Sequence, residues 1–262
     1  MTITTPDAQV RRVPARGGFS PTILRLELRR LLRNRRAVIF TLVVPSLFFL
    51  LFGTDQEYRT EQAGHGNLTA WIMVSMAVYG AMIATTSGGA MVATERAVGW
   101  SRQLRLTPLH PVAYVLVKAV VAMAMGAVAI VVVFVVGHLV GAELSTGRLL
   151  ACGVLAWVCS LVFAAFGLFM GYLLPSENVM QVLGPALAVL SLAGGLFVPL
   201  SEFSGTFADV ARLTPAYGVG ELARAPFGDG GDLVLATLNV VVWAAIFVAG
   251  AAWRMSRDTA RV

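Results

Sequence analysis

Long apolar runs alternate along this sequence with short stretches that hold the charged residues. Six runs of 18 to 33 residues contain no aspartate, glutamate, lysine or arginine. An α-helix needs about 20 residues to cross about 30 Å of hydrocarbon, so each run is long enough for one crossing. We therefore predict an all-α polytopic membrane protein with six transmembrane helices. The expected spans are residues 37–54, 68–93, 118–140, 149–174, 178–200 and 233–253.

The composition and the distribution of charge extend this prediction to an orientation. Hydrophobic residues make up 57% of the 262 residues and charged residues 13%, and the net charge is +6. One side of the predicted membrane carries 16 basic and 5 acidic residues, in residues 1–36, 95–118, 177 and 254–262. The other side carries 4 basic and 9 acidic residues, in residues 55–61, 143–148 and 202–232. Because basic residues near helix ends are retained in the cytoplasm, both termini are predicted to be cytoplasmic.

The N-terminal 36 residues divide into two parts. Residues 1–20 contain little that could pack, which predicts a mobile cytoplasmic tail. Residues 254–262 are predicted to form a second cytoplasmic tail. In residues 21–36, leucines alternate with arginines, which is typical of an amphipathic helix in the headgroup layer. A positive-inside anchor with no further role explains the pattern equally well. The candidate interfacial arginines are Arg25, Arg29, Arg30 and Arg33.

The stretch between the second and third spans has the pattern of a separate short helix. Thr94 is a candidate N-cap, Glu95 falls in the first turn, and Arg102 and Arg105 lie near the end, as the helix dipole favours. Pro108 would end this helix. We predict a cytoplasmic helix that lies across the membrane plane, after which the chain re-enters the bilayer near Lys118. A solvated interfacial helix without a partner is the alternative.

About 30 residues separate the fifth span from the sixth, which is long for a connection without secondary structure. We expect short outer helices near residues 203–213 and 217–225, partly folded back into the protein. An ordinary surface loop is the alternative interpretation.

The sequence contains no complete set of catalytic or metal-binding residues. The phosphate-binding motif G-x-x-x-x-G-K-[ST] is missing, and the single lysine, Lys118, follows the apolar residues AYVLV. Cys152 and Cys159 are seven residues apart on one predicted helix, too far for a disulfide, and a metal site has no support. Membrane topology explains the basic residues, so nucleic-acid binding is not predicted. Any uphill transport would take its energy from another chain.

The layout across residues 21–255 resembles the type-2 ABC exporter permeases, which include daunorubicin-resistance and polysaccharide-export permeases. The most specific element is the segment ERAVGW from Glu95 to Trp100, followed by LRLTPL from Leu104 to Leu109, although Trp100 stands where a threonine often occurs. The resemblance implies that Glu95 to Leu106 forms a coupling helix that contacts an ATP-binding subunit. The implied coupling residues are Glu95, Arg96, Gly99, Arg102 and Arg105.

The resemblance also implies the partners and the substrate path. Two permease chains, identical or different, would assemble with two ATPase chains that bind ATP and Mg²⁺, with no cofactor on this chain. The path between the permeases would suit a hydrophobic or amphipathic drug, lipid or glycolipid. Its candidate lining is Phe48, Phe49, Met73, Met76, Tyr79 and Met82, although a methionine stripe at helical spacing is more often part of a core.

The resemblance further implies a location in the inner membrane of a bacterium, among membrane lipids. A second class of function remains open. A non-transporting membrane scaffold could recruit a cytoplasmic partner through its basic N-terminal helix, and residues 94–111 would then be dispensable.

Overall fold

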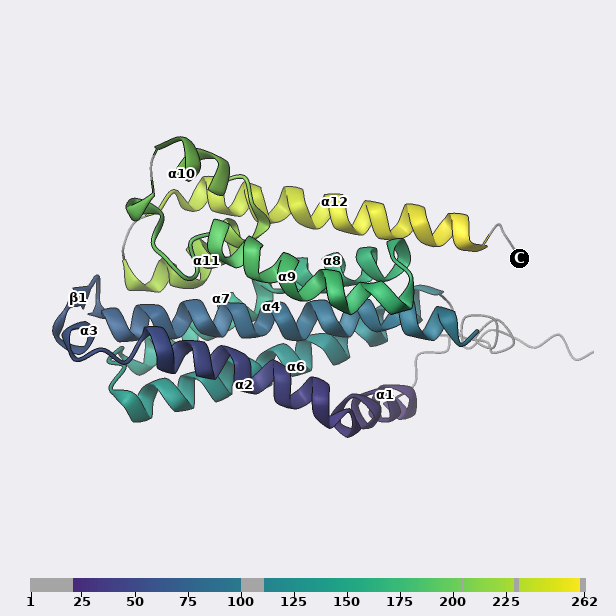
Figure 1. Cartoon of the computed structure of the whole chain (residues 1–262), viewed down its shortest axis with the longest axis horizontal. Helices are drawn as coiled ribbons and strands as arrows, with labels where there is room; N and C mark the ends of the chain where they lie inside the picture. Colours follow the sequence, from purple (N-terminus) through teal and green to yellow (C-terminus); the bar gives the residue numbers. More distant parts are fainter. Residues whose placement is uncertain (1–20, 100–110, 204, 229–230, 260–262) are drawn as a thin grey trace, which may run out of the picture.

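The computed structural model describes residues 21–99, 111–203, 205–228 and 231–259, and these residues are almost entirely helical. Apart from the first one, the long helices lie along one common axis (Figure 1). They are α1 (Pro21–Arg33), α2 (Arg35–Phe52), α4 (Leu68–Ala97), α6 (Pro111–Val140), α7 (Thr146–Cys159), α8 (Leu161–Leu173), α9 (Ser176–Ala193) and α12 (Leu233–Thr259). The short elements are α3 (Gln56–Thr60), the antiparallel pair β1 (Gln62–Ala63) and β2 (Gly66–Asn67), η1 (Leu200–Glu202), α10 (Gly205–Ala211), α11 (Pro215–Arg224) and η2 (Ala225–Phe227).

The bundle has two distinct ends, which we call the α1 end and the α3 end. At the α1 end lie α1, the end of α4 and the end of α12; at the α3 end lie α3, β1, α10 and α11 (Figure 1). Helix α4 is the centre of the bundle, because α2, α6, α8 and α9 all pack against it. Helix α12 packs on α8 and α11 and is otherwise largely uncovered.

The prediction of an all-α polytopic membrane protein is confirmed, whereas the count of six spans stays a prediction. Within the described ranges, four helical stretches are long and apolar enough to cross a bilayer: Leu68–Ala97, Val112–Val140, Thr146–Leu173 and Leu233–Arg257. The third joins α7 and α8. A fifth follows if α1 and α2, which are bent by 62° relative to each other, count as one span. Helix α9, which contains Pro185, is not among them.

Several helix boundaries differ from the predicted ones, and the differences follow one physical rule. We expected spans to stop where charged residues begin, but α4 continues past residue 93 to Ala97 and α6 begins at Pro111 instead of 118. Likewise, α12 continues past residue 253 to Thr259. A helix extends through charged residues wherever those charges find partners or water, so hydrophobicity alone does not mark its ends.

The chain between α9 and α12 folds back onto the bundle. Helix α11 packs against α4, α7, α9 and α12, and most of its residues are buried. Its Arg224 donates hydrogen bonds to Ser75 Oγ at 3.0 Å and to Glu221 Oε1 at 2.8 Å. The Arg224 guanidinium also lies 4.5 Å from the centre of the Trp71 ring. These contacts attach α11 to the first half of α4.

Helices α4 and α8 approach each other closely through glycine. A Cβ atom on Gly167 of α8 would clash with the backbone of Thr86 on α4, and one on Gly89 would clash with the backbone of α8. The Thr86 hydroxyl donates a hydrogen bond to the Phe163 carbonyl at 3.3 Å. Small residues allow such packing in membranes, where helix association depends on van der Waals contact.

Replacing Gly167 with valine should therefore destabilise the protein, because the added side chain must push α4 and α8 apart. We expect a loss of about 1–3 kcal/mol in the free energy of unfolding, as for an overpacked core. The control is Gly184→Ala on α9, where an added Cβ meets no atom within 4 Å. Thermal unfolding in detergent micelles measures both variants, and equal melting temperatures would contradict the close-packing argument.

Candidate functional site

An ionic cluster at the α1 end joins three helices. Its members are Glu27 and Arg30 of α1, Glu95 in the last turn of α4, and Tyr114 and Lys118 near the start of α6. The amphipathic pattern of α1 positions the first two. Leu31 of α1 is buried against Val117 and Val121 of α6, which brings the polar residues of α1 over the α4–α6 contact. We call these five residues the ionic cluster.

Glu95 and Lys118 form the buried centre of the cluster. Glu95 is 1% exposed and Lys118 4% exposed. The Lys118 ammonium donates to Glu95 Oε1 and also to Glu27 Oε2, the latter at 2.6 Å. Since a buried charge is stable only when paired, these two residues depend on each other.

The remaining members complete the hydrogen bonding of Glu95. Arg30 Nη1 donates to Glu95 Oε1 at 2.7 Å, and the Tyr114 hydroxyl donates to Glu95 Oε2. Both carboxylate oxygens of Glu95 are thus satisfied. Two carboxylates face two basic side chains, and together they link α1, α4 and α6.

Arg96, the next residue on α4, connects the same turn to a fourth helix. Its guanidinium donates to the carbonyl oxygens of Gly171 at 3.2 Å and of Tyr172 at 3.1 Å, and lies 5.5 Å from the centre of the Tyr172 ring. These carbonyls belong to the last turn of α8, where the helix dipole favours a cation. The last turn of α4 therefore contacts α1 and α6 through Glu95, and α8 through Arg96.

The structure corrects the expected start of the short helix between the second and third spans. Thr94 does not cap a new helix, because α4 is continuous through Ala97, and Glu95 and Arg96 lie in its last turn. The helix ends at Ala97 with Val98 as its C-cap, and Gly99 follows with a φ of +72°, a left-handed conformation that favours glycine. The predicted contact residues Arg102 and Arg105 lie outside the described residues, and so does the body of the predicted coupling helix.

The four predicted interfacial arginines are not equivalent. Arg25, Arg29 and Arg33 are exposed on α1, as expected for side chains that reach lipid headgroups or water. Arg30 instead turns toward α4 and pairs with Glu95. The helix itself ends at Arg33, so residues 35 and 36 belong to α2.

The candidate path residues lie mostly inside the chain. Phe49, Met73, Met76, Tyr79 and Met82 are all buried in the main core. Phe48 is partly exposed, and its ring stacks on Tyr79 with 5.9 Å between centroids. This burial favours core packing, the alternative that the stripe left open, and their role in a substrate path stays a prediction.

Sequence reasoning did not find Glu27, Tyr114 or Lys118 as members of a site. Two signals were present: Glu27 is the only acidic residue in a helix rich in arginine, and Lys118 is the only lysine of the chain, at the start of an apolar run. An isolated charge at the edge of an apolar run often has a partner on another helix. Which helix supplies that partner depends on the tertiary fold.

Replacing Lys118 with methionine should destabilise the protein by about 3–5 kcal/mol, because it leaves the buried Glu95 carboxylate short of a partner. The double variant Lys118→Met with Glu95→Gln should recover a large part of this loss, since it removes both charges. Arg29→Met, on the exposed face of α1, should change little and serves as the control. Thermal unfolding in detergent decides the matter: a double variant no more stable than the single one would overturn the ion-pair account.

Comparisons with known proteins agree with the membrane architecture. Residues 21–227 match the family described as ABC-2 type transporter. The chain is also similar to a protein of Bacillus subtilis (strain 168) named "Putative transport permease YvfS", with 26% identity over 205 residues. That match covers 76% of this chain and 82% of the relative. Since the family match covers most of the chain, including α1, α4, α6 and the ionic cluster, the protein belongs to the ABC-2 type transporter family, as a membrane permease subunit.

Proposed function

We propose that this chain is the permease subunit of an exporter whose energy comes from ATP hydrolysis on a separate subunit. That ATPase binds ATP and Mg²⁺ and contacts the permease at residues 98–110. The ionic cluster is the observation that carries this proposal. It flanks the segment on both sides, with Glu95 three residues before it and Tyr114 four residues after it.

The cluster gives this segment a mechanical connection to the membrane helices. A force on residues 98–110 acts on the end of α4 and the start of α6, and these are joined to α1 by Lys118 and Arg30. Arg96 carries the same force to α8. Closure of the ATPase could therefore shift four helices together, a rigid-body movement of the kind common in transporters.

The predicted coupling residues then divide into two roles. Glu95 is nearly inaccessible and Arg96 is bound to α8, so both act as positioning residues that hold the end of α4. Gly99 provides the turn by which the chain leaves the helix. Arg102 and Arg105 remain the candidates for direct contact with the ATPase, since they follow this turn.

Exposed apolar surfaces on α2 and α9 support our proposals for the transported substrate and for a second permease chain. Val43, Leu47 and Leu51 of α2 are exposed, as are Val182 and Val189 of α9. Such surfaces suit the membrane interior and a second permease chain, identical or different. We propose that a hydrophobic or amphipathic cargo, such as a drug, lipid or glycolipid, leaves the cell between the two permeases.

The orientation follows from the charges at the two ends. Arg25, Arg29 and Arg33 are exposed at the α1 end, whereas the α3 end carries Asp55, Glu57 and other acidic residues. We therefore place the α1 end and both termini in the cytoplasm of a bacterium, with the bundle in the plasma membrane.

The double variant Arg102→Ala with Arg105→Ala tests the contact with the ATPase. The purified permease alone should hydrolyse no ATP, and the complex with its partner ATPase should do so. We expect the double variant to weaken assembly of that complex at least about tenfold, because each lost interfacial charge pair costs free energy of binding. Titration of the ATPase into permease-containing vesicles measures the change.

Two controls separate contact from positioning. Arg25→Ala, on the exposed face of α1, should leave assembly unchanged. Glu95→Gln should lower the melting temperature and reduce transport per ATP hydrolysed, whereas the double arginine variant should keep the wild-type melting temperature. Unchanged assembly and transport in the double variant would rule out this segment as the ATPase contact. A wild-type chain that neither binds an ATPase nor transports would favour the scaffold without transport.

A further inference from the structure

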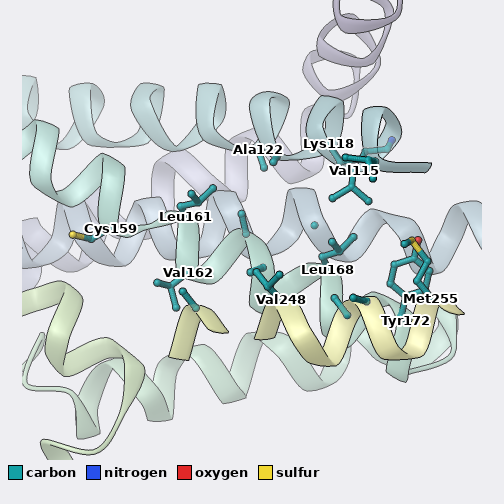
Figure 2. A pocket seen from close by; sticks show the side chains of 18 of the residues that line it. Val115, Lys118, Ala122, Cys159, Leu161, Val162, Leu168, Tyr172, Val248 and Met255 are labelled. Carbon is teal, nitrogen blue, oxygen red and sulfur yellow. The ribbon is translucent and has the colours of Figure 1, made fainter. Parts of the chain in front are cut away.

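A cavity of about 470 Å³ lies between α6 and α12, on the surface of α8 (Figure 2). It exists because α12 packs on α8 and α11 but diverges from α6. Small side chains leave the space open, among them Ala119 and Ala122 of α6, Ala165 of α8 and Ala244 of α12. Apart from Lys118 and Tyr172, the lining carries aliphatic or sulfur-containing side chains. We call this space the α6–α12 groove.

The groove is long and follows the helix axes. On α7 and α8 its lining extends from Val158 to Tyr172, and on α12 from Val240 to Met255. At 1.5 Å per residue, these distances are each about 20 Å. One leaflet of a bilayer contributes about 15 Å of hydrocarbon, half of the usual 30 Å. An extended apolar groove of this length matches one acyl chain better than a compact drug-sized molecule.

One end of the groove is polar and basic. Tyr172, Met255 and Lys118 lie together at the α1 end of the groove (Figure 2). Arg96 lies over the Tyr172 ring, and Arg254 follows the lining residue Ala251 by three positions, on the same side of α12.

Two further observations place this end at the level of lipid headgroups and describe its charge. The Trp253 ring lies 5.8 Å from the Arg254 guanidinium and 4.3 Å from that of Arg257, and tryptophan and tyrosine favour the headgroup layer. The nearby carboxylates of Glu27 and Glu95 are already paired with Lys118 and Arg30. Arg254 and Arg257 therefore add positive charge at this end of the groove.

We propose that the α6–α12 groove binds an anionic phospholipid of the leaflet at the α1 end. One acyl chain fills the groove, and the phosphate lies near Arg254. Charge complementarity selects an anionic lipid over a zwitterionic one, because basic side chains at the membrane surface attract anionic headgroups. The groove does not include the α2 and α9 surfaces proposed above for the second permease. Lipid binding there requires only a bilayer, so it is independent of the proposed export function.

Spin-labelled lipids test the proposal on the full-length chain in phosphatidylcholine vesicles. The probes are phosphatidylglycerol and phosphatidylcholine, each labelled near the end of one acyl chain. Electron spin resonance measures the fraction of label immobilised by the protein. We expect about fivefold preferential binding of phosphatidylglycerol at the groove, the factor that one basic contact at the membrane surface supplies.

Two matched pairs of variants locate the site. Ala244→Phe fills the groove and should abolish the preferentially immobilised phosphatidylglycerol, whereas Ala245→Phe, on the neighbouring exposed position outside the lining, should not. Arg254→Gln should reduce the preference to that of phosphatidylcholine, whereas Arg148→Gln, at the start of α7, should preserve it.

Three results would overturn the proposal. Equal immobilisation of the two lipids by the wild-type protein would mean that the groove contacts lipid without selecting charge. An unchanged signal for Ala244→Phe would place the bound lipid elsewhere. If Arg254→Gln keeps the preference for phosphatidylglycerol, Arg254 does not contact the headgroup. This variant adds no bulk to the groove, so its result does not depend on whether the groove tolerates a larger side chain.

Discussion

The contact between Glu95 and Lys118 determines how one end of this bundle is assembled. Both side chains are almost fully buried, and an unpaired charge in such surroundings costs several kcal/mol. Each charge therefore stabilises the other and fixes the position of α6 relative to α4. Glu27 and Arg30 attach α1 to the same contact, because Lys118 also pairs with Glu27 and Glu95 also pairs with Arg30. A helix that by its sequence could simply lie in the headgroup layer is thus attached at a defined position.

The same contact explains what the sequence could and could not predict. Apolar runs identified the helices, because hydrophobicity is a property of each segment alone. The roles of Glu95 and Arg30 depended on the partners that these residues find on other helices, which only the tertiary fold determines. In the sequence, a glutamate at the end of an apolar run is typical of the solvated first turn of a new helix, and Thr94 fits the N-cap of that helix. In the folded chain the partners supplied by α1 and α6 allow α4 to continue through this residue.

The methionine-rich face of α4 illustrates a second limit. Met73, Met76 and Met82 recur at helical spacing, which suits either a lining or a core. Whether these methionines line a path or lie in a core depends on how many other helices cover α4. Helix α4 is covered by α2, α6, α8 and α9, so even its polar Thr85 and Thr86 are buried, and Ser191 of α9 lies against Met82. No local pattern distinguishes a central helix from a peripheral one when both are apolar on every face.

Helix α4 also connects the two ends of the molecule. Near its start, Trp71 and Ser75 hold Arg224 of α11, and near its end Glu95 holds the ionic cluster. These positions are 24 residues apart from Trp71 to Glu95, or about 36 Å along the helix. The helix contains no proline, and its Gly88–Gly89 pair is packed against α6 and α8, so it has no evident point of bending. A displacement of its last turn must then be shared by α11 at the opposite end, because a rigid helix moves as one body.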